Sequence, residues 1–201
     1  MRAKLSILLL CLILPVFSGC QSSRKIETAS IIENVSISED NGQIYYTFYV
    51  LSSVDKPKGI RIPSDSFKSA CLLAEKEYIP NLSLSKLELL MIEDSVLEYT
   101  LKNDIEYISA QPFFSPVAYV TLCDKKTIEK FDENNAEQDL IEEQLILLKN
   151  NNPEVCIDYL SVFNHFASDR ISDFTVGYVT CEHELKISER KIIKNNVKKF
   201  V

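Results

Sequence analysis

The sequence is poor in the residues from which several kinds of functional site are built. It contains no tryptophan, four glycines and two histidines among 201 residues. A glycine-rich loop that could cradle phosphate groups is missing, so nucleotide binding has no support. The main apolar run, residues 5–17, is shorter than the ~20 residues that a helix needs to cross the hydrocarbon layer. These absences argue against a nucleotide-dependent enzyme and against a permanently membrane-spanning chain.

The first 19 residues have the order of a secretory signal. Two basic residues precede the apolar run, and the small residues Ser18 and Gly19 follow it. The small pair runs directly into a cysteine, and the motif FSGC (residues 17–20) resembles a bacterial lipobox. This resemblance implies cleavage between Gly19 and Cys20 and a diacylglyceryl group on the Cys20 thiol. The alternative is a secretory signal followed by an incidental cysteine.

The lipid anchor predicts where the rest of the chain resides. A single acyl chain attaches a protein only marginally, whereas two chains hold it firmly at a bilayer. Lipidated Cys20 therefore predicts stable attachment to the extracytoplasmic face of a membrane. Residues 20–25 are a short polar leash, so the folded domain, residues 26–201, should lie close to the bilayer surface.

The charge of the mature chain does not favour nucleic acid as a partner. The whole sequence has a formal net charge of -7. Removing residues 1–19 takes away Arg2 and Lys4 and no acidic residue, which leaves a net charge of -9. Phosphate backbones are bound by clustered basic residues rather than by an acidic surface.

Four cysteines remain beyond the anchor, and four cysteines allow three disulfide connectivities. Cys71 and Cys156 lie at apolar positions of helical patterns, and buried cysteine packs as a small hydrophobe. We therefore favour four thiols over disulfides. The spacings do not match a CxxC metal site, and no metal or other cofactor is expected apart from the covalent lipid. The four residues are Cys71, Cys123, Cys156 and Cys181.

Local patterns predict the elements of the domain. Asn41-Gly42 between two β-prone runs, residues 26–38 and 43–53, predicts a hairpin. The second arm is apolar on both faces, which is typical of a covered sheet. Further strands are expected at residues 87–92 and 117–122, helices at 66–78 and 139–148, and a second hairpin from 174–181 and 185–193.

Capping residues predict two further helices. The first begins at Asp94 or Ser95 and turns Leu97, Leu101, Ile105 and Ile108 inward, and Ser64 or Asp65 should cap the helix at 66–78. The second is capped by Asn152, starts at Pro153 and runs to Ala167, with Cys156, Tyr159, Leu160 and Phe163 on its inner face. Residues 132–138 are a weak candidate for a linker. The expected fold class is α+β (mixed α/β), a sheet with an N-terminal hairpin covered by helices.

Candidate catalytic residues are few. His165 falls on the polar side of its predicted helix, and no residue that could orient its ring is identifiable by spacing. Cys181 and His183 share one face of a predicted strand, but a lone Cys-x-His pattern is more typical of structure than of catalysis. The acidic pairs 39–40, 132–133 and 142–143 lack calcium-loop spacing. The chain is therefore not expected to be an enzyme. The C-terminal lysines 191, 194, 198 and 199 are either a solvated helix face or a patch for anionic lipid.

The order of motifs resembles the N-terminal part of the C-subunit lipoproteins of bacterial spore germinant receptors, the Ger(x)C family. The matching segments are GCQSSRKIE (residues 19–27), ASII (residues 29–32) and the strand with its acidic end KLELLMIED (residues 86–94). The resemblance covers residues 17–131, and members of this family continue through further domains.

The resemblance implies a non-catalytic subunit on the outer face of the spore inner membrane. Its partners would be the membrane, through the anchor on Cys20, and integral-membrane receptor subunits that respond to nutrients. The alternative is a generic extracytoplasmic lipoprotein that binds a small ligand or a partner protein.

Overall fold

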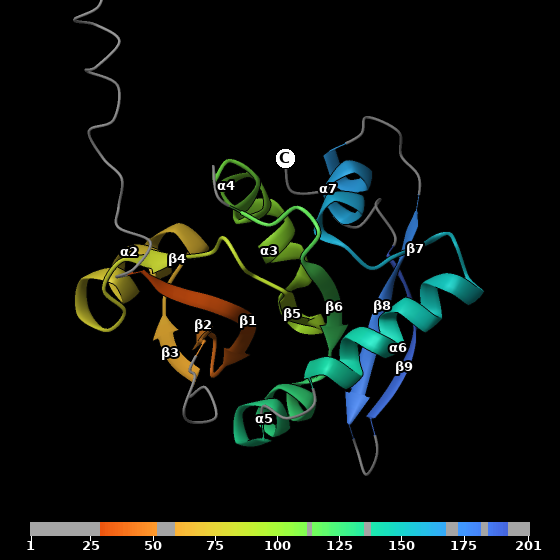
Figure 1. Cartoon of the computed structure of the whole chain (residues 1–201), viewed down its shortest axis with the longest axis horizontal. Coiled ribbons are helices and arrows are strands. Elements are labelled where there is room, and N and C mark those ends of the chain that lie inside the picture. Colours follow the sequence, from red (N-terminus) through yellow and green to blue (C-terminus); the bar gives the residue numbers. More distant parts are fainter. Residues whose placement is uncertain are drawn as a thin grey trace, which may run out of the picture.

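The domain is built on a mixed β-sheet with helices on both of its faces (Figure 1). The computed structural model describes residues 29–51, 59–111, 114–134, 138–167, 173–181 and 185–192. The sheet contains nine strands in these ranges, in the order β3-β2-β1-β5-β6-β8-β7, with β4 beside β1 and β9 beside β8. The predicted fold class, a sheet with a hairpin and covering helices, is confirmed.

The N-terminal hairpin forms where Asn41-Gly42 predicts it. β1 (Ser30–Asp40) and β2 (Gln43–Val50) are antiparallel, and Ile37 lies opposite Tyr46. Asn41 and Gly42 both have positive φ, 52° and 80°, which is the conformation that two-residue hairpin turns require. β2 is apolar on both faces because Tyr46 and Phe48 enter one core and Tyr49 the other.

The middle of the sheet is parallel. β5 (Leu89–Glu93) pairs in parallel with β1 and with β6 (Tyr119–Cys123), and β6 pairs in parallel with β8 (Phe174–Cys181). A parallel strand that is buried on both faces has a continuous apolar sequence, as β5 largely does. The remaining strands are β3 (Gly59–Pro63), β4 (Leu82–Ser83), β7 (Val155–Cys156) and β9 (Leu185–Ile192).

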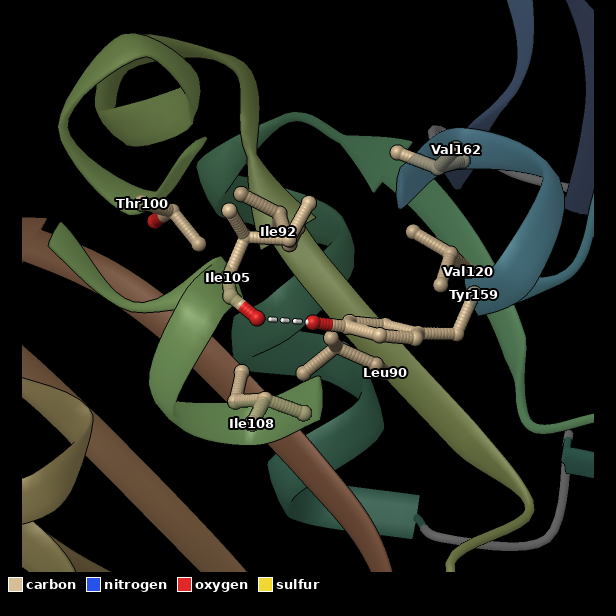
Figure 2. Close-up of a pocket in the computed structure, with 8 residues that line it drawn as sticks. All are labelled: Leu90, Ile92, Thr100, Ile105, Ile108, Val120, Tyr159 and Val162. Atoms are coloured by element: carbon tan, nitrogen blue, oxygen red, sulfur yellow. Dashed lines mark hydrogen bonds between the residues drawn. The ribbon is translucent and has the colours of Figure 1, made fainter. Parts of the chain in front are cut away.

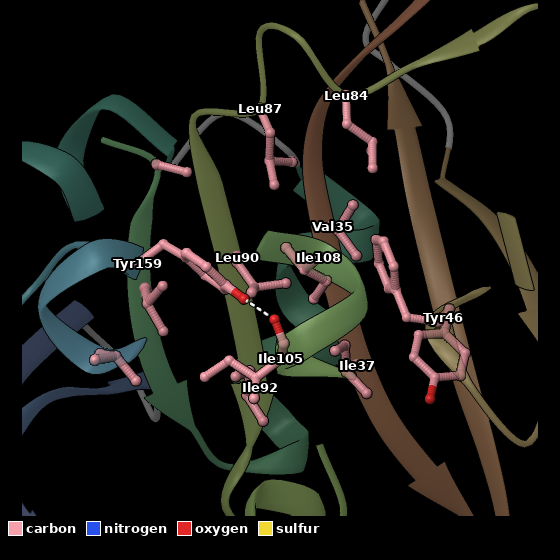
Figure 3. Close-up of a cluster of buried hydrophobic side chains, with 14 of the residues drawn as sticks. Val35, Ile37, Tyr46, Leu84, Leu87, Leu90, Ile92, Ile105, Ile108 and Tyr159 are labelled. Atoms are coloured by element: carbon pink, nitrogen blue, oxygen red, sulfur yellow. Dashed lines mark hydrogen bonds between the residues drawn. The ribbon is translucent and has the colours of Figure 1, made fainter. Parts of the chain in front are cut away.

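Two hydrophobic cores lie on opposite faces of the sheet. The large face is covered by α2 (Phe67–Glu77), α3 (Leu97–Asn103), α4 (Ile105–Ser109) and α7 (Tyr159–Ala167). The small face is covered by α5 (Lys125–Asn134) and α6 (Gln138–Asn151). Figure 3 shows side chains from β1, β5 and α4 meeting on the large face, where the Tyr159 hydroxyl donates to the carbonyl of Ile105.

α2 forms as predicted, but its cap is Ser66 rather than Ser64 or Asp65. The Ser66 hydroxyl oxygen accepts the amide of Ser69 at 3.2 Å, which satisfies an N–H of the first turn. Phe67, Ala70, Cys71 and Ala74 are buried, as their helical spacing indicates.

The helix predicted from Asp94 to Ile108 is wrong as a single element. A 3₁₀ turn (Asp94–Val96) leads into α3, and a break at Asp104 separates α3 from α4. Asp104 is fully buried, and its carboxylate accepts the Phe67 amide and the Tyr46 hydroxyl, each at 2.8 Å. These tertiary bonds hold the break in place, while Leu97, Ile105 and Ile108 are buried as expected. The side chain of Leu101 lies outside the described residues.

The helix predicted from Pro153 to Ala167 is wrong in its first half. Val155–Cys156 is the strand β7, which lies beside the start of β8, and the Val120 amide donates to the Ile157 carbonyl at 2.8 Å. Asp158, rather than Asn152, caps the helix, because its Oδ1 accepts the Ser161 amide at 2.8 Å. Tyr159 is buried as predicted, but Leu160 is 49% exposed.

The polar segment after β6 contains an unpredicted helix. Asp124 accepts the Thr127 amide at 2.9 Å at the start of α5, which runs through the first residues of the proposed linker at 132–138. Strands on both sides of that segment lie in the one sheet. β3 is also unpredicted; it ends at Pro63, and Ile62 pairs with Tyr46 of β2.

The second hairpin is present, with β8 and β9 antiparallel from Phe174 opposite Ile192 to Cys181 opposite Leu185. Gly177 faces α6, and a β-carbon at this position would lie 2.5 Å from Leu145 Cδ2. The absence of a side chain therefore sets how closely α6 approaches the sheet.

Candidate functional site

The predicted lipid-attachment site lies outside the described residues. This holds for Cys20, for Gly19 on the other side of the predicted cleavage point, and for the leash. Beyond the leash, the strand β1 starts at Ser30, ten residues after Cys20. β1, β5 and β6 run in parallel, so the sheet has an amino edge, where these strands begin, and a carboxyl edge, where they end.

The carboxyl edge has the topology of a ligand site in doubly wound proteins. The helices after β5 cover the large face, whereas α5 after β6 covers the small face. Where the helices that follow two neighbouring parallel strands lie on opposite faces, a crevice opens between the strand ends. Many α/β sheets bind ligands in this crevice. Here the crevice position holds Glu93, which is buried. Its Oε2 accepts the Glu39 amide at 2.9 Å and its Oε1 accepts the Ser95 hydroxyl at 2.7 Å.

Ion pairs close the rest of this edge. Asp40 lies 2.9 Å from the Lys125 ammonium and 3.8 Å from Arg61, and Asp94 lies 2.6 Å from Arg190. The hydrogen bond and charge of Lys125 lower the pKa of Asp40 below its usual value, and Asp40 raises the pKa of Lys125. The acidic groups are thus bonded to the protein's own cations and amides. In the described parts of the chain, no cluster of three or more histidine, cysteine or acidic side chains is arranged to hold a metal ion.

Asp104 is the most deeply buried carboxyl group with a perturbed pKa. Burial raises its pKa, and the two hydrogen bonds from the Phe67 amide and Tyr46 hydroxyl oppose that rise. Burial, with Asp104 as the second cause, raises the pKa of the Cys71 thiol to about 12 and also raises the pKa of Tyr46. The Asp104 carboxyl group lies within the large core, where its hydrogen bonds join the start of α4 to α2 and β2.

Cys71, Cys123, Cys156 and Cys181 are buried free thiols, as predicted. Cys156 Sγ lies 3.6 Å from His165 Nδ1, on an exposed histidine. The same Nδ1 lies 3.0 Å from the Ser161 carbonyl oxygen, which can only accept, so Nδ1 carries a proton there and is not a base toward the thiol. Burial also raises the pKa of Cys156. This contact therefore does not activate a nucleophile.

The second Cys–His candidate is only half described. Cys181 is buried, and the Lys130 ammonium lies 3.7 Å from its sulfur. His183 lies outside the described residues, as do lysines 194, 198 and 199 of the C-terminal segment.

The described residues line a small cavity in the large core and a larger one between the end of α6 and α7. The smaller, of about 10 Å³, is enclosed by aliphatic side chains, Thr100 and Tyr159 (Figure 2). It is comparable to the space of one water molecule and cannot hold a substrate. The larger, of about 300 Å³, lies beside Cys156, His165 and Lys149. The Lys149 ammonium donates to the carbonyls of Pro153 and Val155, each at 2.7 Å, so this cation is already bound to the backbone.

Large apolar side chains are exposed at the amino edge, as they also are on α2 (Leu72, 58%) and on α6 (Leu147, 59%). Val117 precedes β6 and is 72% exposed, and Leu160 in α7 is 49% exposed. Sequence patterns assigned both residues to buried elements, so this feature was missed.

Among the described residues, no helix combines the length and the apolar character needed to span a membrane. Comparisons of the chain with protein-family models, with curated proteins and with solved structures found no match.

Proposed function

We propose that this chain is a lipid-anchored, non-catalytic subunit of a spore germinant receptor, attached through Cys20 to the extracytoplasmic face of the spore inner membrane. The observation that carries the proposal is the lipobox-like motif FSGC at residues 17–20, followed after ten residues by the first strand of a folded domain. The receptor assignment itself comes from the resemblance of residues 17–131 to the Ger(x)C lipoproteins.

The geometry of the domain favours a binding role over chemistry. At the carboxyl edge, where α/β enzymes commonly hold ligands, Glu93, Asp40 and Asp94 are bonded to protein amides and cations. The Cys156–His165 contact does not activate a thiol, because Nδ1 donates to Ser161.

The anchor is tested by the mass and the location of the native protein. We expect mature material to begin at Cys20 with a thioether-linked diacylglyceryl group, and Cys20→Ala to move the protein from the membrane fraction to the soluble fraction. Ser22→Ala is the matched control, because it changes the adjacent leash and leaves the motif intact. An unmodified Cys20, or unchanged membrane partitioning of Cys20→Ala, would contradict the proposal.

The receptor assignment is tested by partners and by phenotype. Purification from detergent-solubilised spore membranes should recover a multi-span integral-membrane subunit together with this chain. Deleting the gene should slow germination triggered by at least one nutrient. If germination by every nutrient tested is unchanged, the chain has another role even when the anchor is present.

The second candidate is a lipoprotein that binds a small ligand, and the larger cavity favours it. Its volume of about 300 Å³ lies at the lower limit of small-molecule pockets. Ser161→Trp should fill this cavity from α7. Loss of ligand-dependent stabilisation in that variant, with normal germination of spores that carry it, would favour this candidate over a receptor subunit.

A further inference from the structure

We infer that the amino edge of the sheet is a membrane-contact surface, on which Leu51, Tyr78, Val117 and Leu160 meet the headgroup region of the bilayer. The inference rests on the proposed lipid anchor at Cys20 and adds which face of the domain lies against the membrane. The occupant of this apolar surface is therefore the lipid surface itself.

The four side chains are large and exposed. The exposed fractions are 44% for Leu51, 57% for Tyr78, 72% for Val117 and 49% for Leu160. They come from four different segments: the end of β2, the C-cap of α2, the turn before β6 and the first turn of α7. Their exposure is therefore not the outer face of one amphipathic helix.

Backbone hydrogen bonds place these segments in a row along the amino edge. The Leu51 amide donates to the Ile31 carbonyl at 2.8 Å, and the Ser30 amide donates to the Asn81 carbonyl at 3.2 Å, so Leu51 and the turn after Tyr78 flank the start of β1. On the other side, the Leu160 amide donates to the Pro116 carbonyl at 3.4 Å, which puts Leu160 beside Val117.

The start of β5 joins the two halves of this row. The Glu88 amide donates to the Glu33 carbonyl at 2.8 Å, and the Tyr119 amide donates to the Glu88 carbonyl at 2.7 Å. The backbone is therefore continuous along this edge from the end of β2, past β1 and β5, to the start of β6 and α7, and the exposed Glu88 lies between the two apolar pairs. Figure 1 shows β1, β5 and β6 following one another in this order across the sheet.

The length of the leash selects this edge. Ten residues separate Cys20 from Ser30, a span of at most ~35 Å when fully extended and ~17 Å as a flexible chain. β1 has 11 residues, so the carboxyl edge lies roughly 33 Å beyond its start. Either span from Cys20 to Ser30 brings the amino edge to the bilayer, whereas the carboxyl edge could reach it only if these ten residues were nearly straight and folded back along the domain.

The two edges differ in the side chains that they expose. The carboxyl edge exposes ion pairs, Asp40 with Lys125 and Asp94 with Arg190, whereas the amino edge exposes the apolar side chains described above. At the amino edge, Tyr78 offers an apolar ring with a polar hydroxyl. This combination is favoured at membrane interfaces, where one end of the side chain is wet.

The test measures the depth of single labelled sites in vesicles. Full-length protein is matured and lipidated in a bacterial host and reconstituted into phosphatidylcholine vesicles that contain phosphatidylglycerol. Val117→Cys or Leu160→Cys then carries an environment-sensitive fluorophore, and lipids that are spin-labelled at the headgroup quench it. Leu140→Cys is the matched control, because Leu140 is 42% exposed on α6 over the small face. The four native thiols of the domain are buried.

We expect quenching at residues 117 and 160 to be several-fold stronger than at residue 140, with equal thermal unfolding midpoints for the three proteins. Equal quenching at all three sites, in protein that floats with the vesicles, would overturn the orientation and leave the anchor in place. Protein that carries no lipid on Cys20 and does not float would overturn the anchor, and the orientation with it. Stronger quenching at residue 140 would assign the small face to the membrane.

Discussion

The two faces of the sheet contain the same kind of hydrogen bond in different surroundings. On the large face, Tyr46 donates to Asp104, and on the small face Tyr49 donates to Asp132. Asp104 is fully buried and also accepts the Phe67 amide, so it has two donors and no contact with solvent. Asp132 is exposed, and Tyr49 has a second polar neighbour, the Ser36 hydroxyl at 3.2 Å.

This difference shows that the two faces are held in different ways. The large face is tied together by a buried carboxylate that links α2, the α3–α4 break and β2, so its parts depend on one another. The small face is covered by two helices whose contacts with the sheet are mainly apolar. We therefore expect substitutions on the large face to lower the free energy of unfolding more than equivalent substitutions on the small face, where the helices can repack.

The sharpest comparison uses two consecutive leucines of β5. Leu90 lies in the large core and Leu89 in the small core, and both are almost completely buried. Leu90→Ala should lower the free energy of unfolding by about 4 kcal/mol and Leu89→Ala by about 3 kcal/mol, because the cost grows with the cavity that remains. Leu90 already lines a small void, and we expect α6 to close part of the space that Leu89→Ala leaves. Urea unfolding measures both, and a larger loss for Leu89→Ala would reverse the comparison.

The two tyrosine–aspartate pairs provide the second test. Asp104→Ala leaves two buried donors without an acceptor and should lower the free energy of unfolding by about 2–4 kcal/mol. Asp132→Ala should lower it by less than about 1 kcal/mol, because Tyr49 keeps Ser36 within reach. Chemical denaturation of both variants decides this, and equal losses would show that the small face is as interdependent as the large one.

Gly177 tests how far the small face can adjust. A methyl group there would lie 2.5 Å from Leu145 Cδ2, so Gly177→Ala should lower the free energy of unfolding by about 1–2 kcal/mol through overpacking. Combining it with Leu145→Ala should cost less than the sum of the two single changes. Additive losses in thermal unfolding would mean that α6 does not move.

The pH dependence of stability should distinguish the buried carboxyl group. Burial raises the pKa of Asp104, so the folded state holds this proton more tightly than the unfolded state. Its contribution to stability therefore falls as pH rises from the ordinary carboxyl value of about 4 through the higher pKa of the folded state. Comparing wild type with Asp104→Asn in urea at several pH values isolates this group. The stability advantage of wild type should shrink with rising pH, and an advantage that grows would contradict this assignment.

The smallest effect is expected at the carboxyl edge. Arg190→Ala removes the ion pair with Asp94, which is partly exposed, and should change stability by about 0.2–1 kcal/mol at low salt and less at high salt. A loss of more than about 2 kcal/mol in urea unfolding would show that this edge, rather than the large core, holds β9 to the domain.

Local sequence signals predicted the elements whose conformation is decided locally. Asn41-Gly42 determines the first hairpin because two adjacent positions adopt positive φ. β5 and α6 were likewise predicted from runs and periodicity. β7 was missed because its two residues become a strand only through β8 and through the bond between Val120 and Ile157. The break at Asp104 depends on α2 and β2, which lie far from it in the sequence.

The candidate sites also divide into one that a local motif predicts and one that depends on residues distant in the sequence. The anchor at Cys20 is a local motif and stays a prediction, since it lies outside the described residues. The exposed row along the amino edge joins residues from Leu51 to Leu160, and no spacing rule connects them. Val117 and Leu160 are apolar, so the sequence indicated burial, and only the arrangement of β6 and α7 shows that they face outward.

The outermost strands have a consequence for how copies of this domain behave side by side. β3 carries Arg61 and Pro63, and β9 carries Lys186, Glu189 and Arg190. Proline cannot donate to a ladder, and charged side chains on an outer strand oppose pairing with another sheet. We therefore expect both outer strands to oppose edge-to-edge pairing between copies of the domain that are held on one surface.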